Sequence, residues 1–285
     1  MDKKLLTPGP LTTSMSTKEA MLHDWGSRDQ KFIDLNQSIR DSLIKLIDGE
    51  GNYQCVPMQG SGTFAVESMV SSLTPKDANI LILINGAYGQ RMKKMCTYLN
   101  RNAIEYEVAE HEPHDMTKLE EIIDANKQLT HVFAVYCETT SGILNPINDI
   151  AELAHKYGAY IIVDAAQLAA HVPIQMSGFE NKNKNIDALV FSGHKTYAPG
   201  SPGVVIAKKS FLSAVEPDEV GGGMVDRVSP DNYFVTKTFP DREEAGTPNI
   251  LGAITLGAAI HILDQIGMDT VLNEDMELTL SLIHI

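Results

Sequence analysis

The chain has 285 residues, enough for one large domain or two smaller ones with a sizeable core. Its hydrophobic content of 43% and charged content of 21% are those of an ordinary globular protein. The net charge of −14 argues against a nucleic-acid or anionic-membrane partner. No apolar run approaches the roughly 18–20 residues of a membrane span, and three widely spaced cysteines without a CxxC pair disfavour a disulfide framework or a zinc site. We therefore expect a cytoplasmic protein without a metal site.

The predicted elements alternate between helices and short apolar strands. The first is a helix over residues 30–48, whose apolar side chains recur near helical spacing. Strands are expected at residues 79–84, 103–109, 131–137, 159–163, 187–191 and 203–207. Several of these strands are apolar on both faces, as strands covered by helices on both sides must be. The alternation predicts an α/β domain with a mainly parallel sheet flanked by helices, which binds its ligands at the carboxyl ends of the strands.

Two of the connecting helices carry signals at their ends. The helix expected at 117–127 begins with Thr117 and Glu120, which have the spacing of a capping box. The helix expected at 147–157 precedes Gly158, which is well placed as a C-terminal cap.

The chain is expected to have three parts: an N-terminal arm at 1–20, a large domain at 21–270 and a truncated tail at 271–285. A helix is predicted at 248–267, and no compact finishing element follows it. The last six residues, 280–285, also resemble the translation of a transposase sequencing adapter, whereas an ordinary apolar tail is the alternative. Under the first interpretation a small C-terminal domain is missing.

The strongest local motif is FSGHKTYAPGSPGVVI at residues 191–206. Lys195 follows a predicted strand amid small residues, so its amine can project into a cleft at the strand end. An amine with a lowered pKa in such a cleft is the nucleophile that forms a Schiff base with a carbonyl cofactor. Ser192 and His194 could donate hydrogen bonds to a phosphate. A surface lysine in a Gly/Pro loop is the alternative.

A carboxylate stands at the end of the preceding strand. The segment VDAAQ, residues 163–167, closes that strand with Asp164. A carboxylate at this edge can pair with a protonated pyridine nitrogen and keep the ring an electron sink. Taken alone, an acid at a strand end is usually a helix cap or a turn former. Lys195 follows the next strand, however, as expected for a pair of groups on adjacent strand ends.

A glycine-rich turn, QGSGTFAVES at residues 59–68, opens a predicted helix. Free backbone N–H groups and the helix dipole make such a turn a cradle for a phosphate. Gly60, Gly62 and Ala65 also match the G-x-G-x-x-G/A pattern of a dinucleotide site. That site needs an acidic residue at the end of the next strand. Because the strand NILILI is followed by Asn-Gly, the sequence disfavours a dinucleotide site.

Two further segments follow strands and fit the same cleft. NGAYGQR, residues 85–91, presents Tyr88 between glycines, where its ring could stack on a planar cofactor. CETTSGILNPI, residues 137–147, offers Thr139 to a ring hydroxyl. Each alone is more often packing or turn chemistry, but together the five segments predict one site.

These segments resemble the class V aminotransferases of fold type I, and the resemblance extends to about residue 270. Up to about residue 160, the motifs TPGP, GSRD, QGSGTF, NGAYGQR and CETTSGILNPI are closest to 2-aminoethylphosphonate–pyruvate transaminases. The resemblance implies that Ser61, Gly62 and Thr63 hold the phosphate of pyridoxal 5'-phosphate. It also implies that Tyr88 stacks on the cofactor ring and that Thr139 touches the ring hydroxyl.

The second half is instead similar to cysteine desulfurases and related class V enzymes. The segments that carry this similarity are VDAAQLAAHVPI, FSGHKTYAPGSPG, GGGMVDRVS and REEAGTPNILGA. By this resemblance, Gln167 contacts the ring hydroxyl, and Ser192 with His194 binds the phosphate. Gly246 and Thr247 would reach the phosphate bound by a neighbouring subunit, which implies a homodimer.

The resemblance to the class V aminotransferases also implies that Asp164 contacts the pyridine nitrogen and that Lys195 is the Schiff-base lysine. The resemblance changes near residues 160–170, as expected either for a divergent natural enzyme or for two joined reads. The cofactor site is expected in both cases, because both halves supply matching parts of it, but the substrate cannot be carried over in the same way.

Three functions are compatible with the sequence. The leading one is transamination between 2-aminoethylphosphonate and pyruvate, which rests on the resemblance of the first half. The second is cysteine desulfuration or a related lyase reaction, which needs a nucleophilic cysteine that Cys55, Cys96 and Cys137 do not supply. The third is an inactive cofactor-binding fragment that lacks the arginine for the substrate carboxylate.

Overall fold

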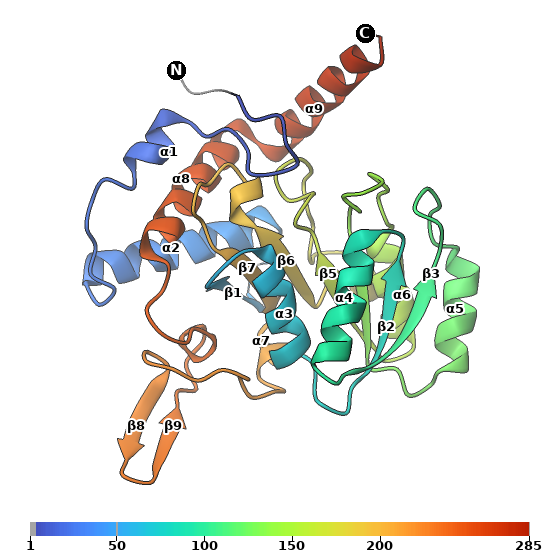
Figure 1. Ribbon diagram of the computed structural model, residues 1–285, viewed down its shortest axis with the longest axis horizontal. Coiled ribbons are helices and arrows are strands. Elements are labelled where there is room, and N and C mark those ends of the chain that lie inside the picture. Colours follow the sequence, from blue (N-terminus) through green and yellow to red (C-terminus); the bar gives the residue numbers. More distant parts are fainter. Residues whose placement is uncertain (1–3, 50, 285) are drawn as a thin grey trace.

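A computed structural model describes residues 4–49 and 51–284 (Figure 1). Residues 1–3 of the expected N-terminal arm and Ile285 of the expected tail lie outside the described residues. The centre of the molecule is a seven-stranded sheet with the order β1-β7-β6-β5-β4-β2-β3. Its strands are β1 (Tyr53–Met58), β2 (Asn79–Ile84), β3 (Asn102–Glu107), β4 (His131–Val135), β5 (Tyr160–Asp164), β6 (Ala188–Ser192) and β7 (Gly203–Lys208).

The sheet is mainly parallel, as the sequence predicts. Strands β3, β2, β4, β5 and β6 run in one direction. Strand β7 is antiparallel to both of its neighbours, β6 and β1, so β1 runs the same way as the parallel strands. All the predicted strands are present, and β1 is an additional one. Gln54 and Pro57 interrupt its apolar pattern, and the sheet tolerates this proline because β1 is an edge strand.

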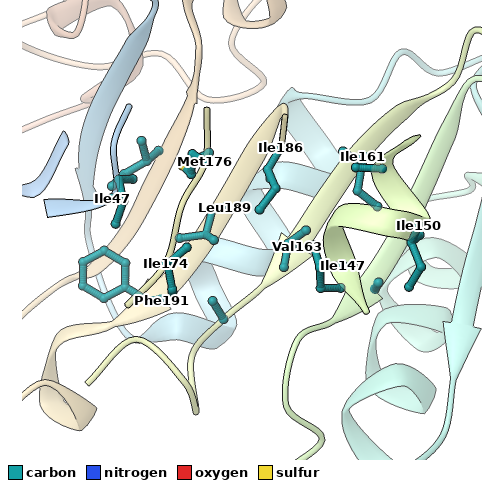
Figure 2. Packing of buried hydrophobic residues seen from close by; sticks show 14 of the residues in the cluster. Ile47, Ile147, Ile150, Ile161, Val163, Ile174, Met176, Ile186, Leu189 and Phe191 are labelled. Atoms are coloured by element: carbon teal, nitrogen blue, oxygen red, sulfur yellow. The ribbon is translucent and has the colours of Figure 1, made fainter. Parts of the chain in front are cut away.

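Helices cover both faces of the sheet (Figure 1). One face packs against α2 (Gln30–Leu46), α5 (Met116–Ala125), α6 (Ile147–Lys156) and α8 (Ile250–Ile266). The other packs against α3 (Gly62–Ser72), α4 (Ala87–Tyr98) and α7 (Lys209–Leu212). Strand β2 serves both layers, because Leu81 and Leu83 join the first cluster while Ile80, Ile82 and Ile84 join the second. Figure 2 shows part of the first cluster, where Val163 of β5 and Leu189 of β6 face Ile147 and Ile174.

Smaller elements lie around this core. They are α1 (Met15–Glu19), α9 (Met268–Ile283), the 3₁₀ turns η1 (Lys182–Lys184), η2 (Gly193–Lys195) and η3 (Asp241–Glu243), and a hairpin of β8 (Val225–Ser229) and β9 (Asn232–Val235). The hairpin projects away from the main body of the molecule (Figure 1).

The ends of two helices test the signals in the sequence. Gly158 follows the end of α6 with φ +80°, which confirms it as the left-handed residue after the helix. The prediction of a capping box at Thr117 and Glu120 is wrong. The N-cap is Asp115, whose carboxylate accepts the N–H groups of Thr117 and Lys118 at 2.8 and 3.1 Å, so Thr117 already lies inside the helix.

The chain beyond residue 267 forms the helix α9. Gly267 separates α8 from α9, and the two helices meet at a bend of 81°. Within residues 4–49 and 51–284, no single helix is long and apolar enough to cross a membrane, although α8 and α9 would qualify if taken together.

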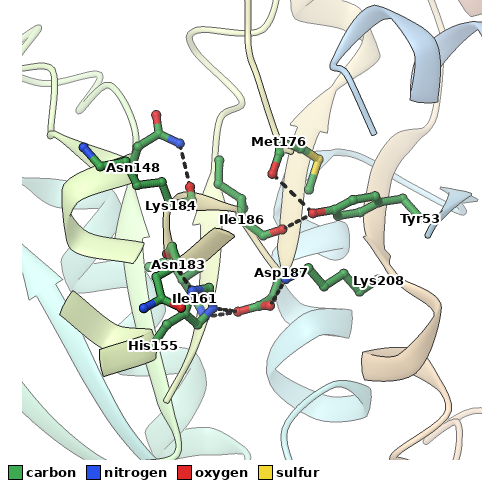
Figure 3. Close-up of polar contacts among 10 residues, drawn as sticks. All are labelled: Tyr53, Asn148, His155, Ile161, Met176, Asn183, Lys184, Ile186, Asp187 and Lys208. Atoms are coloured by element: carbon green, nitrogen blue, oxygen red, sulfur yellow. Dashed lines mark hydrogen bonds and ion pairs between the residues drawn. The ribbon is translucent and has the colours of Figure 1, made fainter. Parts of the chain in front are cut away.

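A buried carboxylate ties strands and a helix together near the amino ends of β5 and β6 (Figure 3). Asp187 accepts a hydrogen bond from Ile161 N–H at 2.8 Å, contacts His155 Nε2 at 2.8 Å and pairs with Lys208 Nζ at 2.7 Å. Burial alone would raise the pKa of Asp187, but His155 and Lys208 outweigh it and hold that pKa below its ordinary value. This cluster lies near the amino ends of the parallel strands, whereas the predicted site lies at their carboxyl ends.

Candidate active site

A cavity of about 210 Å³ lies at the carboxyl ends of the parallel strands. The chain enters it from four directions: after β1, after β2, at the end of β5 and after β6. Its polar lining consists of Ser61, Thr63, Tyr88, Arg91, Asp164, Ser192, His194 and Lys195, with Gly62 beside them. The sequence singles out all of these except Arg91, and the structure places them around one cavity, whereas the role of each remains a prediction.

The turn after β1 is held tightly against the turn after β6. Ser61 is the N-cap of α3, and the N–H of Gly62 donates a hydrogen bond to Ser192 Oγ at 3.2 Å. Ser192 Oγ also lies 2.8 Å from His194 Nδ1. A Cβ atom at Gly62 would lie 3.0 Å from Ser192 Cβ and 3.1 Å from Ser192 Oγ, so a side chain at Gly62 would crowd the contact between the two turns. The first turn of α3 therefore opens toward the cavity with donors suited to an anion.

Asp164 is the most buried charged group of this cavity, with 6% of its surface exposed. Its Oδ1 accepts the N–H of Ala166 at 2.9 Å. Burial raises the pKa of Asp164 to about 6, although the Ala166 N–H and the charge of Lys195 act in the opposite direction. A buried carboxylate that lines a cavity is stabilised by a cationic partner inside it.

Lys195 lies in η2, directly after β6, and its strand pairs with β5. This confirms the predicted placement of Asp164 and Lys195 on adjacent strand ends. Lys195 Nζ donates a hydrogen bond to Gln167 Oε1 at 3.2 Å and lies 5.4 Å from the centre of the Tyr88 ring. Burial, together with the charge of Lys195, lowers the pKa of the neighbouring His194. His194 is therefore a neutral hydrogen-bonding group at pH 7.

Two residues that the sequence analysis does not single out support the wall formed by Tyr88. The guanidinium carbon of Arg91 lies 4.5 Å from the centre of the Tyr88 ring, and its Nη1 donates to Thr63 Oγ1 at 3.3 Å. Glu138 is fully buried, and its carboxylate accepts the N–H of Tyr88 at 3.3 Å and the hydroxyl of Thr140 at 2.9 Å. The spacing of Arg91 three residues after Tyr88 could have indicated a shared helix face.

The remaining predicted residues lie outside the lining of this cavity. Thr139 is half-buried beside Glu138, and Gln167 reaches the site through Lys195. The N–H of Gly246 donates to the carbonyl of Gly222 at 2.7 Å, while the carbonyl of Thr247 accepts the side-chain amide of Gln59. Gly246 and Thr247 therefore do not line this cavity, and their contact with a neighbouring subunit stays a prediction.

The donor set fits pyridoxal 5'-phosphate. The buried carboxylate of Asp164 suits a protonated ring nitrogen, the amine of Lys195 suits an aldehyde, and the turn at Ser61–Thr63 suits a phosphate. The fold and the cavity together define an α/β protein of fold type I.

The family comparison identifies this chain more narrowly. It matches the class V aminotransferase family over residues 14–284 and belongs to that family. It is 43% identical over 214 residues to the 2-aminoethylphosphonate–pyruvate transaminase of Pseudomonas putida, a match that covers 74% of this chain and 56% of the relative. The enzyme of the same name from Cupriavidus necator is 43% identical over 215 residues, with 75% and 55% covered. The chain thus spans little more than half the length of the curated relatives it matches.

Solved structures support the fold. An alanine–glyoxylate aminotransferase from Nostoc sp. superposes with a TM-score of 0.79 at 18% identity, covering 96% of this chain and 71% of that one. A cysteine desulfurase from Thermococcus onnurineus superposes with a TM-score of 0.75 at 24% identity, covering 90% and 66%. At these identities the likeness establishes the fold alone.

Proposed function

We propose that this chain is the cofactor-binding part of an aminotransferase that exchanges an amino group between 2-aminoethylphosphonate and pyruvate. The observation that carries the proposal is the meeting of Lys195 and Asp164 in one cavity beside an anion cradle. The choice of substrates is supported by the 43% identity to relatives of that name.

In this function, pyridoxal 5'-phosphate supplies a carbonyl carbon and an electron-accepting ring when it is bound. Lys195 would hold the cofactor through Nζ, and Asp164 would hold the positive charge of the ring nitrogen. Ser61, Gly62 and Thr63 would bind the phosphate with Ser192. Tyr88 forms one wall of the ring site.

Lys195 has a second task once a substrate amine has replaced it. Its amine must then move a proton at the substrate carbon, which requires Nζ to remain near the reacting atoms. Gln167 accepts a hydrogen bond from Nζ at 3.2 Å and so restrains the position of the amine, which lines the cavity.

The anionic end of the substrate fits the same electrostatics. Arg91 is an exposed guanidinium on the cavity wall, directly beside Thr63. Phosphonate and phosphate groups are recognised by arginine and by the N-terminus of a helix.

We extend the proposal to a cytoplasmic homodimer in which Gly246 and Thr247 contact the phosphate bound by the partner.

A desulfurase function receives no support from the thiols. Cys55 and Cys96 are buried, and Cys137 is half-buried. Burial raises the pKa of all three thiols, to about 11 for Cys96, so each resists forming the nucleophilic thiolate.

Covalent trapping tests the proposal directly. Purified protein is incubated with pyridoxal 5'-phosphate, reduced with borohydride and mapped by mass spectrometry. We expect a single modified residue, Lys195, and no adduct in Lys195→Ala. Lys127→Ala is the matched control, because Lys127 is an exposed lysine whose side chain is 65% accessible. Attachment to another lysine, or none at all, would contradict the assignment and favour an inactive fragment.

Amino transfer is measured separately as alanine formed from pyruvate and 2-aminoethylphosphonate by the purified protein. A protein that traps the cofactor on Lys195 but accepts a different amino donor would keep the site and refute the substrate.

A further inference from the structure

The N-terminal segment of residues 5–12 lies against the turn that carries Lys195. The N–H of Leu11 donates a hydrogen bond to the carbonyl of His194 at 3.2 Å. The segment is closed on itself by two further bonds, from Leu5 N–H to Thr12 Oγ1 at 2.7 Å and from Thr7 Oγ1 to the Pro10 carbonyl at 2.9 Å. Residues 5–12 therefore form a compact loop attached to the strand-end turn.

Gly9 is the point of closest approach between this loop and the lysine. A Cβ atom at Gly9 would lie 2.6 Å from Lys195 Cγ and 3.4 Å from both Cδ and Cε. Its φ of +146° is a conformation that residues with side chains rarely adopt. The backbone at Gly9 thus packs directly along the aliphatic stem of Lys195.

We propose that Gly9 is a positioning residue for Lys195. A lysine stem has several rotatable bonds, and a free stem would have to be ordered each time its amine reacts. The Gly9 backbone closes one side of the stem, while Gln167 holds Nζ at the other end. The loop therefore orders the amine before the cofactor arrives. This inference rests on the proposed function, in which Lys195 bonds to the cofactor.

A double-mutant cycle tests it. In Gly9→Ala the new methyl group overlaps Cγ, a stem atom that cannot move aside without shifting Nζ. Overpacking of this kind predicts a loss of affinity for pyridoxal 5'-phosphate of about tenfold. In a Lys195→Ala background the stem is absent, so Gly9→Ala should change the non-covalent affinity by less than about twofold. The proposal is overturned if Gly9→Ala lowers the cofactor affinity equally in both backgrounds, or if it does not lower the affinity in the protein that retains Lys195.

A second readout needs no cofactor. We expect the acetylation rate of Lys195 in the cofactor-free protein to change about threefold or more in Gly9→Ala, measured relative to the exposed Lys127. The reason is that the added methyl group changes the packing around the lysine stem. Gly158→Ala is the control for adding a methyl group at a positive-φ glycine, because Gly158 has φ +80° but meets nothing within 4 Å. It should leave both readouts unchanged. The backbone strain that is specific to Gly9 is present in both backgrounds of the double-mutant cycle and therefore cancels there.

The two hypotheses fail differently. If borohydride traps no adduct on Lys195 in the unmodified protein, the proposed function fails, while an altered acetylation rate in Gly9→Ala would still support the positioning contact. If the adduct forms but the Gly9→Ala acetylation rate equals that of the unmodified protein, the positioning contact fails alone.

Discussion

Asp164 carries an energetic cost in the cofactor-free protein. It is a buried acid whose pKa is raised from 3.8 to about 6. An acid whose pKa is higher in the folded state than in the unfolded state binds protons more readily when folded. The stability of the folded chain therefore falls as pH rises from 3.8 to about 6 and stays lower above it.

We expect Asp164→Asn to stabilise the cofactor-free protein at pH 7 and to weaken cofactor binding. The gain in the free energy of unfolding is on the order of 2–3 kcal/mol at most, from the size of the pKa shift. The benefit should disappear well below pH 3.8, where the acid is protonated in both states. Urea unfolding across pH measures it, with Asp149→Asn as an exposed control. A variant less stable than the parent at pH 7 would contradict this account.

At the scale of single elements, the start of α5 separates two interpretations of the same residues. The Asp115 carboxylate caps the helix by accepting two backbone N–H groups. We expect Asp115→Ala to lower the free energy of unfolding by about 1 kcal/mol, the usual cost of losing an N-cap. Thr117→Ala should change it by less than about 0.5 kcal/mol, because Thr117 supplies no cap. If the two variants lose equal free energy of unfolding, the result would contradict the Asp115 cap and favour the capping box at Thr117.

The elements also show which features are predictable. The apolar strands β2, β4 and β5 and the residues that follow them are visible in the sequence, because period and position relative to a strand end are local properties. The sequence pattern does not reveal β1 because Pro57 is acceptable only at an edge, which is a property of the whole sheet. Glu138 and Gly9 act through contacts between segments that are distant along the chain, and no local pattern shows these.

At the scale of the whole molecule, Asp187 joins α6, β5 and β7 at one point. Burial would lower the pKa of His155, but the bond to Asp187 raises it above its ordinary 6.5. The stability that His155 contributes is therefore present below pH 6.5 and is lost as pH rises through its raised pKa. The contribution of Asp187 is present above pH 3.8 and is lost as pH falls through its lowered pKa.

We expect His155→Gln to destabilise the protein most between about pH 4 and 6.5. The difference in the free energy of unfolding between parent and variant should shrink as pH rises beyond 6.5, because the parent then loses the charged pair. Chemical denaturation at several pH values measures this difference, and His261→Gln is an exposed control. A difference that grows with pH would show that the neutral ring, not the ion pair, stabilises the contact.

The position of β1 has a consequence for the order of events during synthesis. Tyr53 at the start of β1 pairs with Lys208 at the end of β7, so this edge closes only after nearly the whole sheet has been made. The anion cradle at the end of β1 then meets the Lys195 turn, which β7 separates from it in the sheet. Such non-local pairings form slowly, because the entropy cost of closing a long loop comes before any stabilising contact is made. We therefore expect a growing chain to bind the cofactor only after residue 208 has left the ribosome and β1 has paired with β7.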